Sequence, residues 1–286
     1  MPTSAELSQI YDLGYFRDDP DQPDRDGYPD YVAGAASHRR NARRRLRMLA
    51  THHPVRGRLL DVGCAAGYFV AEASAAGWEA EGTDISPDMI EWGLQHVTPN
   101  LSLTPFADLR RPSGGVSAVT MWDYIEHSVD PRMDLAMAHD LLSQGGIVAL
   151  STGDVDSRFA RWTGKRWHLL TPRHHNYFFG SRSLVRLLED VGFDVIAISH
   201  EAAWYPVGHL LYKLGSLTPF DAARRVSTAA RRHRLGDIEV PINLWDIVTV
   251  IAQKSATLAA GRGPKDTGHW LSRMCRAGSS RGARSR

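Results

Sequence analysis

The sequence predicts an α/β protein with a doubly wound, mostly parallel sheet, and three observations carry that prediction. Residues 58–150 alternate between apolar runs and helix-like segments, the order expected of repeated strand–helix–strand units. The apolar runs are continuous, as in strands that helices cover on both faces. One of these runs, residues 59–62, leads into a turn of small residues and then a helix, where such sheets bind ligands.

The turn after this first strand has the pattern Asp-x-Gly-x-x-x-Gly, formed by Asp61, Gly63 and Gly67. A second strand, residues 78–84, follows the helix and ends at Asp84. Small residues let the backbone approach a ligand closely, and an acid at the end of the second strand accepts hydrogen bonds from ribose hydroxyls. Together the two features predict a site for a nucleoside cofactor.

The spacing of the turn decides between nucleosides. A dinucleotide fingerprint, Gly-x-Gly-x-x-Gly, that begins at Gly63 requires glycines where this chain has Ala65 and Tyr68, so the NAD interpretation fails at two of three positions. The pattern that remains resembles the first two motifs of the class I methyltransferases, which use S-adenosylmethionine. At Ala65 the sequence departs from the commonest form of those motifs, which has glycine there.

The resemblance to class I methyltransferases continues in order along the chain. Residues 105–108 resemble the segment after the third strand whose acid contacts adenine, and residues 118–127 resemble the fourth strand and the segment after it. Residues 141–150 resemble the next helix end, Gly-Gly turn and fifth strand. The similarity spans residues 59–254, and its pattern is that of the mixed small-molecule subgroup that includes the ubiquinone-biosynthesis O-methyltransferases.

This resemblance implies a Rossmann-like methyltransferase fold of seven mostly parallel strands with an antiparallel last strand. Residues 193–200 are expected to form a late strand and residues 246–253 the last one. A helix over residues 181–190 is expected before them, capped by Ser181 and ended by Gly192.

Three parts are expected along the chain. Residues 1–57 form an arm and a helix, over residues 38–50, that cover the substrate; residues 58–254 form the methyltransferase domain; and residues 255–286 form a disordered basic tail. The domain contains an insert, residues 201–245, that is expected to be helical. Its apolar and basic side chains suit a roof over the site, a dimer contact or a membrane surface.

The composition is that of an ordinary soluble globular protein, with 286 residues of which 43% are hydrophobic and 23% charged. The formal net charge of +2 is too small to predict nucleic acid as a partner, and the arginines of residues 38–50 are expected to form a solvated helix face. Cys64 and Cys275 cannot form a disulfide framework, and no uncharged apolar stretch of about 18 residues occurs. A cytoplasmic location is therefore expected.

The resemblance implies which residues hold the cofactor, S-adenosyl-L-methionine. Asp84 is expected to accept hydrogen bonds from both ribose hydroxyls, and Asp108 to meet the adenine amino group. For Asp61 the alternative is structural support of the turn, and for Trp122 it is a place in the core. The full set expected at the cofactor is Asp61, Gly63, Cys64, Ala65, Gly67, Asp84, Ile85, Asp108 and Trp122.

A methyl group on a sulfonium is already activated, so the protein has to align the two reactants and remove a proton where the acceptor carries one. Histidine titrates near neutral pH and suits that proton transfer. His127 and His175 are the candidate catalytic bases, although the Glu-His dipeptide that contains His127 is also found as a structural element in the family.

A metal site is the alternative use of the same segment. The run Asp123-x-x-Glu126-His127 resembles the Glu-x-x-Glu-His metal segment of some relatives, with aspartate in place of the first glutamate. Residues three and four apart share one face of a helical turn, so the three side chains can converge on a divalent ion. Because the dipeptide is also common in relatives without metal, no metal is expected.

The sequence thus predicts an enzyme that transfers a methyl group from S-adenosylmethionine to a small or medium-sized acceptor at oxygen, of natural-product, sugar or quinone/phenol type. Two alternatives remain: a catalytically inactive cofactor-binding partner, and a nucleic-acid methyltransferase. A monomer or homodimer is expected, and residues 204–234 are the candidate segment for contact with a membrane surface.

Overall fold

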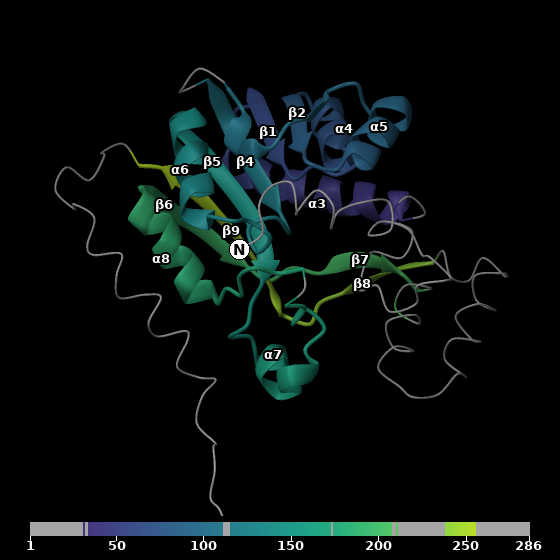
Figure 1. Cartoon of the computed structure of the whole chain (residues 1–286), viewed down its shortest axis with the longest axis vertical. Helices are drawn as coiled ribbons and strands as arrows, with labels where there is room; N and C mark the ends of the chain where they lie inside the picture. The colour runs from purple at the N-terminus through teal and green to yellow at the C-terminus, as the bar shows by residue number, and fades with distance from the viewer. Residues whose placement is uncertain are drawn as a thin grey trace, which may run out of the picture. The chain divides into compact units, whose positions relative to one another are not determined.

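The computed structural model (Figure 1) describes residues 31, 34–110, 115–172, 174–207, 210 and 238–255. Contacts divide the chain into two units, Met1–Ser255 and Ala256–Arg286, and the fold described here belongs to the first. Its centre is a seven-stranded sheet with the strand order β3-β2-β1-β4-β5-β9-β6. The order reverses at β1 and β4, so the doubly wound α/β fold predicted from the sequence is confirmed.

Strands and helices alternate in the first part of the described chain. The elements are α3 (Ala35–His52), β1 (Arg58–Val62), α4 (Tyr68–Ala75), β2 (Glu79–Asp84), α5 (Pro87–His96), β3 (Leu101–Leu103), η1 (Phe106–Asp108) and β4 (Val116–Trp122). The later elements are α6 (Pro131–Leu141), β5 (Leu142–Gly153), α7 (Arg158–Thr163), η2 (Gly164–Arg166), α8 (Ser181–Val191), β6 (Phe193–Ser199), β7 (Ala203–Pro206), β8 (Glu239–Ile242) and β9 (Ile247–Lys254).

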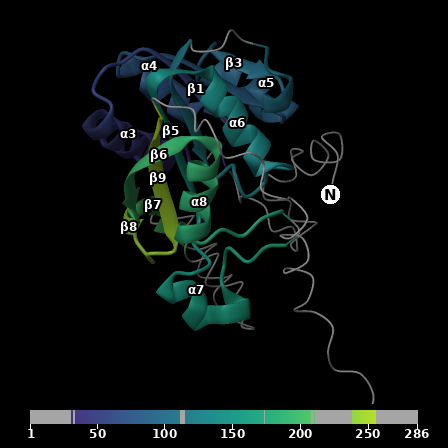
Figure 2. The same cartoon turned by 90° about the vertical axis from the view of Figure 1, so that its left-hand side faces the viewer.

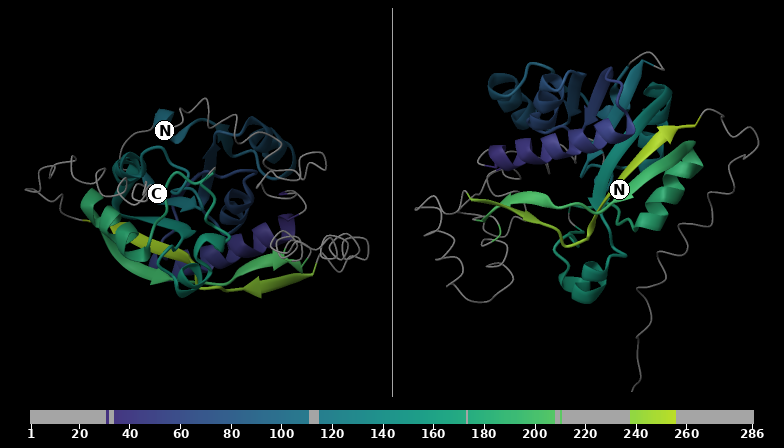
Figure 3. Two further views of the ribbon diagram at one scale, coloured as in Figure 1. Left: turned by 60° about the horizontal axis from the view of Figure 1, so that its bottom comes forward. Right: turned by 180° about the vertical axis from the view of Figure 1, so that it is seen from behind.

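The continuous apolar strands arise because helices cover both faces of the sheet. Successive side chains of a strand point to opposite faces, and on β1 Leu59 belongs to the core layer beneath α3 and α4, with Leu49 and Phe69. Leu60, the next residue, belongs to the layer beneath α6 and α8, with Leu184. Figure 2 and the two views of Figure 3 show these helices on either side of the strands.

The last strand runs against its neighbours, as the resemblance implied. β9 pairs antiparallel with β5 on one side and with β6 on the other, whereas β1 to β5 pair parallel with one another. The predicted strands 193–200 and 246–253 correspond to β6 and β9, each within one residue at its ends. The helix predicted over residues 38–50 is α3, which extends further at both ends.

One predicted helix cap is wrong. The N-cap position of α8 is Gly180, not Ser181, and the Gly180 N–H donates to the hydroxyl of Ser183 at 3.0 Å. The Ser181 hydroxyl donates instead to Asp154 at 2.6 Å, because Asp154 lies buried beneath the start of the helix. The predicted end is correct: Gly192 has a left-handed φ of +108°.

The insert begins and ends in strands. β7 and β8 pair antiparallel as a separate two-stranded sheet, and directly after β7 the described residues Val207 and Leu210 are helical. Residues 208–209 and 211–237, with most of the segment expected to reach a membrane, lie outside the described residues. The same is true of nearly all of the arm before α3 and of the tail from residue 256. No helix in the described part of the chain is both long and apolar enough to cross a bilayer.

Five of the six arginines of α3 form ion pairs, and Arg40, Arg43 and Arg47 lie at exposed positions, so the predicted solvated face is also a paired one. Arg39 and Arg43 both bind Glu72 of α4, at 2.9 and 2.6 Å. Three further pairs connect α3 to later segments: Arg40 with Glu239, Arg44 with Glu201, and Arg45 with Asp123. These pairs hold α3 across the sheet and neutralise much of its positive charge.

Candidate functional site

The turn between β1 and α4 depends on left-handed backbone conformations. Gly63 and Gly67 have φ values of +72° and +79°, and Ala65 has +46°. The N–H groups of Gly63 and Cys64 both donate to the carbonyl oxygen of Thr83, at 2.9 and 3.1 Å. A left-handed φ costs an L-residue about 1–2 kcal/mol. This cost applies to Ala65, whereas the glycine that is commonest at this position in the motifs it resembles adopts the same conformation without strain.

Close packing explains the small residues around this turn. A Cβ on Gly63 would lie 2.7 Å from a ring carbon of Tyr124. On β2, a Cβ on Gly82 would lie 2.7 Å from Cys64, and on α5 a Cβ on Gly93 would lie 2.7 Å from a carbonyl oxygen of the turn. The sequence did not single out Gly82 and Gly93, because their need for glycine appears only when the elements pack.

Asp84 lies at the end of β2 beside the turn. Its two carboxylate oxygens accept from the N–H groups of Ala65 at 2.8 Å and Ser86 at 2.9 Å. Burial raises the pKa of Asp84, and backbone hydrogen bonds, including one from Ile85, oppose that rise. The turn and the acid therefore meet at the carboxyl ends of β1 and β2, an arrangement that fits a nucleoside with a ribose hydroxyl pair.

Asp61 and Cys64 lie beneath the turn. Thr120 of β4 donates to Asp61 at 2.6 Å, which ties β1 to β4 directly below the site. Burial raises the pKa of Asp61 to about 7, although the bond from Thr120 lowers it in part. Burial also raises the pKa of the Cys64 thiol. Both side chains are buried below the turn, where they support it.

Asp108 and Trp122 lie at the ends of the flanking strands. Asp108 ends η1, just after β3, and its side chain is exposed. Trp122 ends β4 and is buried, with its ring edge-on to Phe69 at 5.3 Å and the guanidinium of Arg45 4.5 Å from its centroid. Trp122 thus combines a core position with a cation–π contact.

Tyr31 was not among the residues predicted for the site. Its ring stacks on His38 with centroids 4.1 Å apart, and it packs against the small cluster around Tyr68 beneath the turn. Burial raises the pKa of Tyr31, and the nearby Tyr68, Cys64 and Asp84 raise it further. The ring therefore lies close to the cofactor turn, whose Ala66 belongs to the same cluster. The aromatic content of the arm was the available signal, but it did not indicate where the ring would lie.

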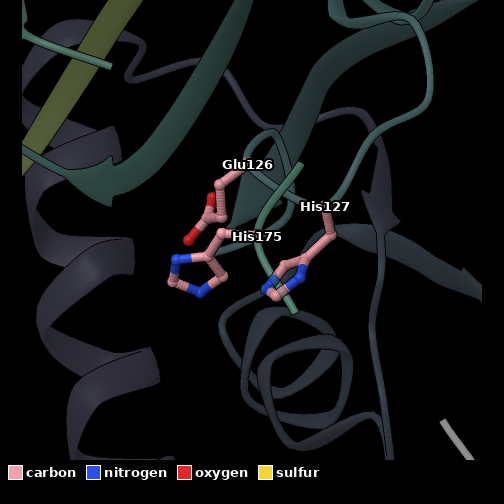
Figure 4. A group of neighbouring side chains, drawn as sticks. All are labelled: Glu126, His127 and His175. Atoms are coloured by element: carbon pink, nitrogen blue, oxygen red, sulfur yellow. The ribbon is translucent and has the colours of Figure 1, made fainter. Parts of the chain in front are cut away.

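Backbone hydrogen bonds bring two distant segments together beyond β4. The carbonyl oxygen of Glu126 accepts from the N–H groups of Asn176 and Tyr177, at 2.8 and 3.1 Å. The Asn176 side chain donates to the carbonyl of His127 at 2.9 Å. As a result His175 lies edge-on to His127 with ring centroids 4.8 Å apart. The two histidines predicted as base candidates thus lie together, as Figure 4 shows.

Burial shifts the pKa values of two side chains in these segments, His127 and Glu126. His127 donates through Nδ1 to the carbonyl of His174 at 2.8 Å, so its Nε2 holds the lone pair. Burial, and then the neighbouring His175, lower the pKa of His127 to about 4. Burial, and then the charge of Asp123, raise the pKa of Glu126 to about 8. Within the described residues, Oε2 of Glu126 is buried without a hydrogen-bond partner.

Glu126, His127 and His175 form a group that is able to hold a metal ion. One ligand atom from each lies within 4.8 Å of the other two (Figure 4). Asp123, part of the set suggested by the sequence, is not in this group, because its carboxylate accepts from Arg45 at 2.9 Å and from Ser151 at 2.9 Å. Its left-handed φ of +53° marks the sharp bend that follows β4.

Comparison with known proteins identifies the family of the chain. A family model described as a methyltransferase domain matches residues 34–198, more than half of the chain, and the chain therefore belongs to that family. The fold is similar to that of the [4+2]-cyclase SpnF, with a TM-score of 0.53, 16% identity, and coverage of 90% of this chain and 98% of the other. It is also similar to magnesium protoporphyrin IX methyltransferase from Synechocystis with bound SAH, with a TM-score of 0.52, 14% identity, and coverage of 80% and 90%.

Two curated relatives are named ubiquinone biosynthesis O-methyltransferase. The one from Methylococcus capsulatus is 31% identical over 117 residues, which cover 38% of this chain and 48% of the relative. The one from Xanthomonas axonopodis is 29% identical over 105 residues, 35% of this chain and 44% of the relative. The chain thus spans about half the length of these relatives. The chain is a member of the methyltransferase-domain family and has the doubly wound fold of solved proteins such as the Synechocystis enzyme.

Proposed function

We propose that the chain methylates an oxygen atom of a small or medium-sized acceptor, with His127 as the general base. The observation that carries this proposal is the bond from Nδ1–H of His127 to the carbonyl of His174 at 2.8 Å, which makes Nε2 the basic nitrogen of the neutral ring. The His127 N–H donates to the carbonyl of Tyr124 at 2.9 Å, and Tyr124 packs against Gly63 of the cofactor turn. The base therefore lies close to that turn.

The residues around the turn are proposed to hold the cofactor. Backbone groups from Gly63 to Gly67 suit its methionine and ribose parts, Asp84 its ribose hydroxyls, and Asp108 its adenine amino group. Support comes from the left-handed turn and from the position of Asp84 at the end of β2. We further propose that the arm before α3 covers this site, since the ring of Tyr31 packs against the cluster that contains Ala66 of the turn.

The chemistry requires little beyond alignment and one proton transfer. S-adenosylmethionine, when bound, would supply a methyl group on a positively charged sulfur. The hydroxyl oxygen would attack the methyl carbon as the carbon–sulfur bond breaks, with S-adenosylhomocysteine as the leaving group. His127 would accept the hydroxyl proton at Nε2 as the oxygen attacks, and general-base catalysis of this kind contributes about 10²–10⁴-fold. His175, in edge contact with His127, would fix the orientation of the ring or take over the proton.

An oxygen acceptor of phenol, quinone, sugar or natural-product type is supported by two observations. The curated relatives are named as O-methyltransferases, although each match covers less than half of its relative. The segment that carries His175 also brings aromatic rings to the site: the ring of Phe178 lies 5.8 Å from that of His175. Aromatic side chains suit stacking against a planar acceptor.

A screen of acceptors tests the proposed reaction. Purified protein is incubated with S-adenosylmethionine and panels of catechols, phenols, sugars and amines, and methylated products are identified by mass spectrometry. Methylation of hydroxyl compounds that is lost in His127→Ala but retained in His52→Ala, an exposed histidine of α3, is the expected result. Transfer confined to amines, or retained in full in His127→Ala, would contradict the proposal.

Metal-assisted methyl transfer is the second candidate, favoured by the grouping of Glu126, His127 and His175 within 4.8 Å. The buried Oε2 of Glu126, which has no hydrogen-bond partner among the described residues, is an additional reason. One carboxylate and two imidazoles suit a first-row divalent cation. A bound divalent cation would favour the ionised form of a hydroxyl acceptor.

The two candidates respond differently to chelation. If a metal takes part, EDTA lowers turnover, and Mn²⁺ or Zn²⁺ restores it and raises the melting temperature of the protein. The Glu126→Gln variant loses that thermal response, whereas Glu79→Gln, at an exposed position of β2, keeps it. If neither turnover nor melting temperature responds to chelator or metal, the metal candidate is eliminated and the base mechanism stands alone.

A further inference from the structure

Residues 158–166 form a projecting basic segment that the proposed reaction does not use. The segment comprises α7 and η2 and leaves the body of the fold after β5. In Figures 1 and 2, and in the right-hand view of Figure 3, α7 lies beyond the ends of the sheet, away from the helices that cover it. Ala160 is the one buried residue of this segment, so the segment contacts the body of the fold through little apolar surface and its outer surface is exposed.

The outer surface of this segment is uniformly positive. Arg158, Arg161, Lys165 and Arg166 are all exposed, and none of them forms an ion pair with another described residue. Residues 157–168 contain no acid. The segment differs from α3 in this respect. Five α3 arginines each have a carboxylate partner, whereas no carboxylate of the described residues pairs with the cations of this segment.

Exposed tryptophans accompany these cations. Trp162 is 81% exposed, the largest value among the exposed apolar side chains of the described residues. Trp245 is 65% exposed, and it lies near the segment because the adjacent Asp246 accepts from the indole N–H of Trp167 at 2.8 Å. An indole is apolar in its body and polar at its N–H, which suits the boundary between water and lipid headgroups.

We propose that residues 158–166, with Trp162 at the tip, form a docking surface for an anionic lipid bilayer. Each arginine or lysine near an anionic bilayer contributes about five-fold to binding, and an inserted indole adds an apolar contribution. A stable protein–protein interface buries about 800 Å² of surface on each partner. A projection of nine residues supplies only part of that area. A flat bilayer needs no more than the tip, so the charge and the shape of the segment favour lipid. The docking does not depend on which acceptor the enzyme methylates.

Vesicle sedimentation with the full chain tests this proposal. The protein is mixed with vesicles of phosphatidylcholine alone or of phosphatidylcholine with phosphatidylglycerol. Binding is expected only to the vesicles that contain phosphatidylglycerol. It should weaken as the ionic strength rises, since the Debye length falls from about 10 Å at 0.1 M to about 3 Å at 1 M.

Two variants assign the binding to the segment. Changing all four cations to glutamine is expected to lower the partition coefficient by about 100-fold or more, and Trp162→Ala by about ten-fold. A control that combines Arg56→Gln and Met133→Ala, both at exposed positions elsewhere, should bind as the native chain does. Cofactor affinity and melting temperature should be the same in all of these proteins.

Three results would overturn the proposal. The first is that the native chain does not sediment with anionic vesicles. The second is that the four-cation variant binds as tightly as the native chain, which would place the lipid affinity in another segment. The third is that the native chain binds polyglutamate but not vesicles, with loss in the same variants, which would make the surface a site for an acidic protein.

Discussion

At the carboxyl ends of β1 and β2, the acids Asp61 and Asp84 accept hydrogen bonds from the protein, whereas beyond β4 one buried carboxylate oxygen accepts none from the described residues. Both oxygens of Asp84 accept backbone N–H groups, and Asp61 accepts from Thr120. Beyond β4, Oε2 of Glu126 has no hydrogen-bond partner among the described residues, and His127 is neutral far below the usual pKa of histidine. Both regions lie at the same edge of one sheet, so the difference comes from the side chains and not from the fold.

We call the region at the carboxyl ends of β1 and β2 the preorganised region, and the region beyond β4 the responsive region. A buried group with all its hydrogen bonds made keeps one geometry, which suits a cofactor of constant shape. A buried carboxylate oxygen without a donor, such as Oε2 of Glu126, is costly to keep, and the protonation of its carboxyl group changes with whatever binds next to it. We infer that the first region is matched to the cofactor and the second to the acceptor and its proton.

The largest expected effect lies in the responsive region. His127→Ala should lower kcat by about 10²–10⁴-fold, because the proposed base is lost, while the dissociation constant of the cofactor changes less than two-fold. Steady-state kinetics on the acceptor found by the screen, with calorimetric titration of the cofactor, measure both quantities. Equal losses in turnover and in cofactor affinity would show that His127 holds the structure and does not act as a base.

In the preorganised region the loss should fall on binding. Asp84→Ala should weaken cofactor affinity by about 10–100-fold, since a hydrogen bond to a charged group contributes about 1.5–3 kcal/mol. Glu79→Gln, on the same strand but exposed, is the matched control and should bind normally. An unchanged dissociation constant in Asp84→Ala, measured by calorimetry on folded protein, would remove this residue from the cofactor site.

The preorganised region was also the predictable one. Asp61, Gly63, Gly67 and Asp84 follow a local pattern, because the turn and the adjacent strand end lie within 24 residues of one another. A short segment with fixed φ values and fixed strand ends leaves few alternative arrangements. The antiparallel last strand followed from the resemblance to a known family, and the structure agrees with it.

The responsive region was only partly predictable, for a physical reason. His127 and His175 were named as candidates, but their contact depends on bonds from Asn176 and Tyr177 to the carbonyl of Glu126, about 50 residues away in the chain. No sequence period indicates a loop-to-loop contact of this kind. The suggestion that Asp123 shares a face with Glu126 failed because the bend after β4 turns its carboxylate towards α3.

A smaller effect tests whether the cofactor turn is tight for steric reasons. Gly63→Ala should destabilise the fold by about 2–3 kcal/mol, because its φ is +72° and the new Cβ would lie 2.7 Å from Tyr124. Gly77→Ala, also at positive φ but with its nearest neighbour at 3.5 Å, should lose only about 1 kcal/mol. Chemical denaturation measures both values. Equal losses would mean that backbone strain alone, without the contact to Tyr124, requires glycine at position 63.

The smallest expected effect, counted per pH unit, is a change in the pH dependence of stability, measured in chelator-treated protein. Glu126 has a pKa of about 8 in the folded chain against 4.5 in its ordinary state. Between these values the folded chain keeps a proton that the unfolded chain has released, so the free energy of unfolding should fall as pH rises, by at most about 1.4 kcal/mol per pH unit.

Glu126→Gln cannot titrate and should lack that decline, whereas His127 should still cost stability as pH falls from about 6.5 towards 4, because its folded pKa is about 4. The two groups thus act in opposite directions, and urea midpoints across this range separate them. If native protein and Glu126→Gln show the same slope above pH 6.5, Glu126 is not protonated in the folded chain. The responsive region would then hold its carboxylate in the charged form, which requires a cation or donor beside Oε2.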